Sequence, residues 1–72
     1  MKQKKFAISH IFTQKGQFLP YATVIDSLAA YFKANITGIS EDEAYRRAFC
    51  SIGGSVTKGF IVQTTGGYQR VA

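Results

Sequence analysis

The chain has 72 residues, of which 46% are hydrophobic and 14% aromatic. A chain this short forms one domain, here residues 1–72, that buries about 60% of the surface exposed by the unfolded chain. One cysteine excludes an internal disulfide, and one histidine leaves no cluster for zinc, so we expect no metal and no cofactor. No apolar run approaches the roughly 18 residues of a membrane span, and the N-terminus shows no signal-peptide pattern, so we expect a cytoplasmic protein without a membrane partner.

The charge of the chain limits its partners. Nine Lys and Arg residues against four Asp and Glu residues give a formal net charge of +5. Three of the four acids are consecutive, at Glu41-Asp42-Glu43, so the rest of the chain is more basic than the total indicates. Such a field favours a polyanion, either nucleic acid or an anionic surface, although solubility alone is the simpler explanation.

The first expected element is a helix over residues 4–15. Ile8, Ile11 and Phe12 have the i, i+3, i+4 spacing of one helical face. Gly16 is suited to end the helix.

A short extended segment and a second helix are expected next. The segment Phe18–Leu19 should be extended because the residue before Pro20 is disfavoured in the α region. Proline suits the first turn of a helix, so a helix is predicted over residues 20–33. Its apolar stripe consists of Tyr21, Val24, Ile25, Leu28 and Phe32.

The third expected helix covers residues 41–52. Ser40 and Glu43 have the spacing of a capping box, in which the serine hydroxyl accepts the third helical amide and the glutamate reaches back. The helix is expected to end at Gly53–Gly54, since glycine adopts the left-handed conformation readily. The inward face is assigned to Ala44, Tyr45, Ala48, Phe49 and Ile52.

The chain closes on a β-hairpin over residues 59–72. Either Gly66–Gly67 forms a two-residue turn, or the turn runs from Thr64 to Gly67 and the strand pairing slips by two residues. Both registers keep the same residues on the same faces. Phe60, Val62 and Val71 are assigned to the core face, while Ile61, Gln63, Tyr68 and Arg70 are assigned to the outward face.

The hydrophobic core predicted from these elements draws on the second and third helices and the hairpin. Its main members are expected to be Val24, Leu28, Phe32, Phe49, Ile52, Phe60 and Val62.

The resulting order is helix, short strand, helix, turn, helix, hairpin, which is an α+β chain. It resembles a small winged helix-turn-helix domain over about residues 4 to 72, in the segments PYATVIDSLAAYF, SEDEAYRRAFCSIGG and KGFIVQTTGGYQRVA. The resemblance implies double-stranded DNA as the partner. It also implies that the third helix enters the major groove and that the hairpin, called the wing, touches the flanking backbone or the minor groove.

The third helix places two arginines outside. Arg46 and Arg47 could contact phosphates, or one of them could bind a guanine edge. Each also follows an acid by four residues, Asp42 and Glu43, and such pairs stabilise a helix by about 0.3–0.5 kcal/mol without any partner. Ser51 is a further candidate for contact with DNA.

Other candidate DNA contacts lie on the hairpin and at the N-terminus. They are Lys58, Thr64, Thr65 and Arg70 around the wing, and Lys4 and Lys5 in a basic arm over residues 1–5. Hydroxyls and free amides at the hairpin tip suit phosphate oxygens. The alternatives are that the glycines only form the turn, that Arg70 keeps a strand edge soluble, and that the lysines belong to a frayed terminus.

Catalysis finds little support, because His10 and Cys50 have no partners at a recognisable spacing. We therefore expect a non-enzymatic DNA-binding protein, either a small transcriptional regulator or an accessory factor, acting as a homodimer because one small module makes few contacts. The alternative is a small inhibitor or adaptor that binds another protein through the acidic helix start, Tyr68 and Ile61.

Overall fold

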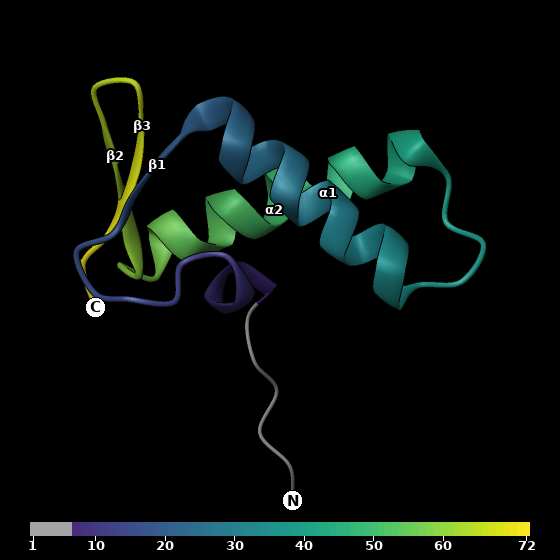
Figure 1. Cartoon of the computed structure of the whole chain (residues 1–72), viewed down its shortest axis with the longest axis horizontal. Coiled ribbons are helices and arrows are strands. Elements are labelled where there is room, and N and C mark those ends of the chain that lie inside the picture. The colour runs from purple at the N-terminus through teal and green to yellow at the C-terminus, as the bar shows by residue number, and fades with distance from the viewer. Residues whose placement is uncertain (1–6) are drawn as a thin grey trace, which may run out of the picture.

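The computed structural model describes residues 7–72, and over these residues the protein is α+β, with two α-helices and a three-stranded antiparallel sheet. The sheet lies at one end of the helix pair, beside the start of α1 and the end of α2 (Figure 1). In chain order the elements are the 3-10 helix η1 (Ala7–His10), β1 (Phe18–Pro20), α1 (Tyr21–Asn35), α2 (Glu41–Thr57), β2 (Ile61–Thr64) and β3 (Gly67–Arg70).

The expectation of a first α-helix over residues 4–15 is wrong for the part that the structure describes. Only the single 3-10 turn Ala7–His10 forms, and the Ile8 carbonyl accepts the Phe12 amide at 2.9 Å. The helix does not continue because the side-chain oxygen of Gln17 accepts the two amides that follow Phe12, at 2.9 and 3.2 Å. Ile8 and Phe12 are nevertheless fully buried.

The other two helices are confirmed, with one boundary corrected. Ser40 accepts the Glu43 amide at 3.1 Å, which confirms the serine half of the expected capping box, while the Glu43 carboxylate pairs with Arg46 and Arg47. However, α2 runs through Gly53–Gly54 and ends at Thr57. Ile52 and Ser55 are buried on the inward side of this last stretch, and their packing offsets the cost of two helical glycines, about 1 kcal/mol each.

The sheet has the order β1-β3-β2, so the last strand lies in the middle. Thr64 pairs with Gly67, which confirms the turn from Thr64 to Gly67 and excludes the two-residue turn at Gly66–Gly67. Gly66 lies inside the turn with φ +82°, a conformation that glycine adopts without a steric penalty.

The expected orientation of the hairpin is reversed. Ile61 is fully buried, whereas Val62 and Val71 are exposed. The buried side of the sheet is completed by Leu19 and Tyr68, which pair across β1 and β3 and pack on the core. The residue before β2 donates a backbone hydrogen bond to the end of α2. This bond positions Ile61 in the space between the helices. The alternation along the strand then turns the valine outward.

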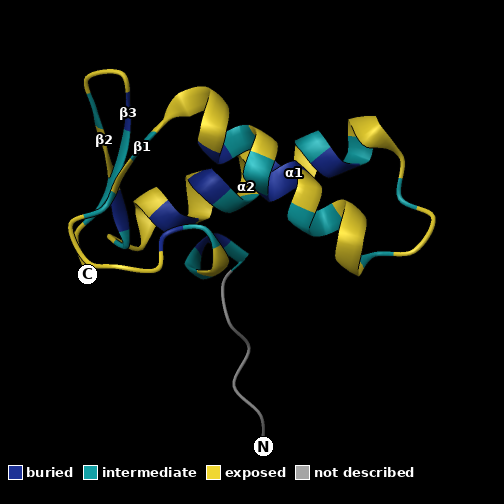
Figure 2. Cartoon of the chain, viewed as in Figure 1, coloured by how far each residue is buried: buried dark blue, intermediate teal, exposed yellow. Residues whose placement is uncertain are grey.

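The core lies between the two helices, η1 and the sheet (Figure 2). Val24, Leu28 and Ile52 are buried as predicted. Phe49 is not part of the core, since 62% of it is exposed. Helix α2 instead packs through small residues that let α1 approach closely. The main core cluster is Ile8, Phe12, Val24, Leu28, Ala48, Ile52 and Ile61, and Phe32 and Phe60 pack against it partly buried.

Candidate nucleic-acid interface

The outward face of α2 is a continuous exposed helical surface. Buried residues at Ala44, Ala48, Ile52 and Ser55 define the inward face. The residues on the opposite side have the i, i+3, i+4, i+7 spacing of one helical stripe and are all exposed. They are Arg46, Phe49, Cys50 and Gly53.

Two arginines on α2 share one carboxylate. The guanidinium of Arg47 lies 3.4 Å from Glu43, which confirms the expected i, i+4 pair. Arg46 pairs with Glu43 as well, at 3.6 Å and i, i+3 spacing, instead of with Asp42. The Arg46 side chain is 73% exposed. Exposed ion pairs of this kind contribute about 0–1 kcal/mol, so both guanidinium groups can exchange the carboxylate for another anion.

The arginines border an open depression of about 510 Å³ between α1 and α2. Ser51 lies in it beside both arginines, so the structure brings together the three residues that the sequence assigned to α2. Guanidinium donors next to an apolar wall suit an anionic group. The described lining residues are Phe32, Glu43, Arg46, Arg47, Cys50 and Ser51.

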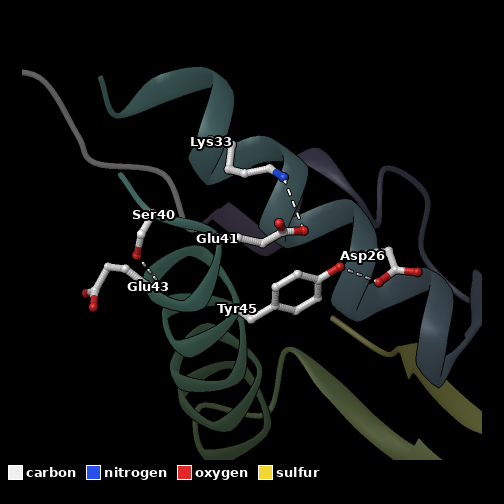
Figure 3. A network of polar contacts seen from close by, with 6 residues as sticks. All are labelled: Asp26, Lys33, Ser40, Glu41, Glu43 and Tyr45. Carbon is white, nitrogen blue, oxygen red and sulfur yellow. Dashed lines mark hydrogen bonds and ion pairs between the residues drawn. The ribbon is translucent and has the colours of Figure 1, made fainter. Parts of the chain in front are cut away.

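Polar contacts at the start of α2 hold this helix against α1 (Figure 3). The Tyr45 hydroxyl donates to the Asp26 carboxylate at 2.9 Å, and Lys33 lies 3.6 Å from Glu41. The hydrogen bond to Asp26, and then the charge of that carboxylate, raise the pKa of Tyr45 above its ordinary value. These contacts use two of the four acids, while Asp42 remains exposed on the first turn.

The hairpin tip is exposed but tied to the start of α1. The Tyr21 hydroxyl donates to the Thr64 carbonyl at 3.0 Å, and the Tyr21 amide donates to the Gly66 carbonyl at 3.3 Å. Thr64 uses its hydroxyl within the turn, donating to the Gly67 carbonyl at 3.4 Å. Thr65 is exposed at the tip, so it is the hydroxyl there that lies open to a partner.

Arg70 does not point outward as expected. Its Nη1 donates to the Phe12 carbonyl at 2.7 Å, its Nε donates to the Ala72 carbonyl at 2.8 Å, and its guanidinium lies 4.5 Å from the centre of the Phe60 ring. The reason is the reversed hairpin, because the face assigned to solvent is the face directed at the body of the protein. Arg70 therefore ties β3 to the loop after η1.

The remaining basic candidates lie elsewhere. Lys58 caps the end of α2 and is exposed, about three turns along the helix from the arginine pair. Lys4 and Lys5 lie outside the described residues, as does Lys2. Of the nine basic residues of the chain, six are therefore described, against all four acids, so residues 7–72 carry a formal charge of only +2.

Two groups of exposed apolar residues were missed by the sequence reasoning. Phe18 and Val62 lie on either side of Gln69 across the three strands, and Val71 follows Gln69 by two residues, so the exposed apolar row of Phe18, Val62 and Val71 on the open face of the sheet surrounds a polar side chain. The other group is on α2, where Phe49 is the more exposed residue and Val56, seven positions later, is exposed as well. The four-residue spacing of Ala44, Ala48, Ile52 and the nearby Ser55 was the signal that could have identified the inward stripe of α2 and placed Phe49 outside it.

Among residues 7–72, no three His, Cys, Asp or Glu side chains gather as metal ligands, and no helix is long and apolar enough to cross a bilayer. Comparison with protein-family models, curated proteins and solved structures finds nothing that matches this chain.

Proposed function

We propose that this protein binds double-stranded DNA, as a small transcriptional regulator or accessory factor, with α2 in the major groove and the hairpin tip on the flanking backbone. The observation that carries the proposal is the exposed face of α2, on which Arg46 and Arg47 share one carboxylate in loose ion pairs. The short strand, the two helices and the hairpin support the resemblance to winged helix-turn-helix domains in part, since the first of the three helices on which it rests is only the 3-10 turn η1.

The exchange of Glu43 for DNA is energetically inexpensive. Each exposed ion pair contributes about 0–1 kcal/mol, while each phosphate neutralised by a guanidinium group releases condensed counterions. An arginine can also bind the O6 and N7 atoms of guanine with two parallel hydrogen bonds. Arg46, the more exposed of the two, is assigned to a base edge, and Arg47 to a phosphate.

The acidic first turn of α2 restricts how the helix meets DNA. Asp42 and Glu41 would repel phosphates, so the middle of α2, from Arg46 to Cys50, approaches the duplex most closely. Thr65 at the hairpin tip is assigned to the backbone. Ser51 and Lys58 on α2, the Thr64 backbone at the tip, and the N-terminal Lys4 and Lys5 would add weaker contacts. Arg70 is left out because its guanidinium is already bound within the chain.

The same proposal includes a second copy of the chain, so that the protein binds DNA as a homodimer. One module of this size makes few contacts, and dimers bind two half-sites about one helical turn apart. The apolar row of Phe18, Val62 and Val71 supports a homodimer through the open face of the sheet. A cytoplasmic, reducing location is proposed as well, because the exposed thiol of Cys50 would elsewhere form disulfides between copies.

The test is a titration of the full chain against a fluorescent random-sequence duplex at several salt concentrations. Log affinity should fall linearly with log salt, and Arg47→Ala should reduce the slope by about one unit. Lys15→Ala is the matched control, because Lys15 is also exposed but lies in the loop before β1. It should leave the slope unchanged. If the protein shows no binding at low salt, DNA is not its partner.

The apolar row also favours a second candidate, an inhibitor or adaptor that binds another protein. Ile61 and Tyr68 cannot form that interface as expected, since Ile61 is buried and Tyr68 packs on the core. Phe18, Val62 and Val71 would form it instead. Sedimentation separates the two candidates: a dimer that binds DNA supports the first, and a monomer without affinity for DNA supports the second.

A further inference from the structure

Phe49 is the most exposed large hydrophobic residue that the structure describes. It stands on α2 with 62% of its surface accessible, one turn after Arg46 and next to Cys50. Gly53, one turn further along, is exposed, and apart from its own helix backbone and chain neighbours nothing in residues 7–72 lies within 4 Å of the place where a side chain would begin. Burying a phenylalanine contributes about 1.5–3 kcal/mol to stability, and the fold forgoes that gain here.

We propose that Phe49 reads DNA sequence by packing on the 5-methyl group of a thymine, close to the base pair that Arg46 contacts. This inference rests on the proposed DNA binding and adds the base that the site prefers. The edges of the bases in the major groove present hydrogen-bond donors and acceptors, and the thymine methyl is the apolar group among them. An exposed aromatic ring on a helix in that groove therefore gains most from thymine.

The spacing along α2 relates the two contacts. Arg46 and Phe49 are three residues apart, so their Cβ atoms are about 5–6 Å from each other on one helix face. Base pairs rise by about 3.4 Å along the duplex. The two side chains therefore reach base pairs one or two steps apart, and the preferred site contains a G·C pair and an A·T pair at that separation.

Charge favours a duplex over a second copy as the occupant of this face. Arg46 and Arg47 lie within one turn before Phe49 on α2, and their guanidinium groups are exposed at the surface. A polyanion that contacts Phe49 is attracted by these two residues, whereas an uncharged partner surface would gain nothing from them. The apolar row on the sheet remains the surface assigned to a second copy.

The experiment begins with the selection of a preferred site from random duplexes by the unmodified protein. Each thymine of that site is then replaced by uracil, which keeps base pairing and removes only the methyl group. One replacement should weaken binding about fourfold, the size expected for one buried methyl group. Phe49→Ala should weaken binding to the original site by a similar factor and be insensitive to that replacement. Arg46→Ala, the matched variant one turn away, should keep the sensitivity.

Each outcome decides between the proposals. Absence of duplex binding by the unmodified protein at low salt overturns the DNA-binding function and this inference together. Binding with the expected salt slope, but with no effect of uracil or the same effect in Phe49→Ala, overturns only the role of Phe49. Conversion of a dimer to a monomer by Phe49→Ala, seen by sedimentation without DNA, shows that Phe49 contacts a second copy and also overturns it. Because Phe49 is exposed, the variant should fold, which thermal unfolding checks.

Discussion

The arginines of α2 and the arginine of β3 carry the same charge but are held in different ways. Arg46 and Arg47 lie 3.4–3.6 Å from a shared carboxylate at the surface. Arg70 donates to two backbone carbonyls at 2.7 and 2.8 Å and stacks on Phe60. The difference shows that a basic residue in the sequence does not by itself indicate whether its charge is available to a partner. Carbonyl acceptors near the guanidinium turn an arginine into part of the fold, and their absence leaves it open to a partner.

The comparison predicts that hairpin changes affect stability and that changes on the outward face of α2 do not. Among the hairpin changes, the largest effect is expected for Gly67→Ala. A Cβ at this position would overlap the Leu19 carbonyl and lie 2.9 Å from the Phe18 ring, so β1 would have to separate from β3. We expect a loss of about 2–3 kcal/mol in unfolding free energy, measured by urea denaturation.

Gly54→Ala is the matched glycine control. Gly54 lies inside α2, is exposed, and has no atom within 4 Å of an added Cβ. Alanine should therefore stabilise the protein by about 0.5–1 kcal/mol. Equal stability of the two variants would show that β1 is not closely paired with β3.

The next largest effect is expected for Arg70→Ala. Loss of a charged hydrogen bond to the Phe12 carbonyl should lower stability by about 1.5–3 kcal/mol, measured by thermal or urea unfolding. The salt slope of DNA binding should not change for the folded variant. A slope lower by one unit, together with unaltered stability, would mean that Arg70 binds phosphate and is not part of the fold.

Arg46→Ala is expected to leave stability nearly unchanged and to weaken DNA binding. Stability should change by no more than about 0.5 kcal/mol, because the ion pair that is lost is exposed. Affinity for the preferred site should fall by about 1–3 kcal/mol, with a smaller effect on random duplexes. Competition titrations measure both. An equal loss on all sequences would reassign Arg46 from a base edge to the backbone.

Phe49→Ala should have a small effect on stability, about 0.5 kcal/mol or less, since most of the ring is already in water. Leu28→Ala provides the contrast, because Leu28 is fully buried and its truncation should cost about 2–5 kcal/mol. Parallel urea denaturation of the two variants tests the difference. A comparable loss of stability in both variants would show that Phe49 is part of the core.

The smallest effect is expected for the hydrogen bond from Tyr45 to Asp26, which holds α2 against α1. The raised pKa of Tyr45 comes from donation to Asp26, so Asp26→Asn should shift the tyrosinate absorbance titration back toward 10.0. Because the folded-state pKa lies above the unfolded one, the contribution to stability is present below pH 10 and is lost as pH rises through the folded value. An unshifted titration in the variant would show that the hydrogen bond does not persist in solution.

Local signals in the sequence determined the elements with clear ends. Pro20 placed the start of α1, the Ser40 capping box placed the start of α2, and the Thr64-to-Gly67 turn was one of two registers considered. The outward position of Arg46 and Arg47 also followed from helical periodicity and is confirmed. Each of these features depends on interactions between residues a few positions apart, which a sequence displays directly.

Only the tertiary structure decided which surfaces turn inward. Strand alternation separates Ile61 from Val62 but does not indicate which of them meets the helices, and that choice reversed the hairpin and drew Arg70 into the fold. Helical periodicity likewise assigned Phe49 to the inward face and the core, and this was wrong because α1 packs closely on the small residues of α2 and leaves Phe49 outside. The physical reason is the same in both cases: burial is a property of two surfaces in contact, and one segment of sequence specifies only one of them.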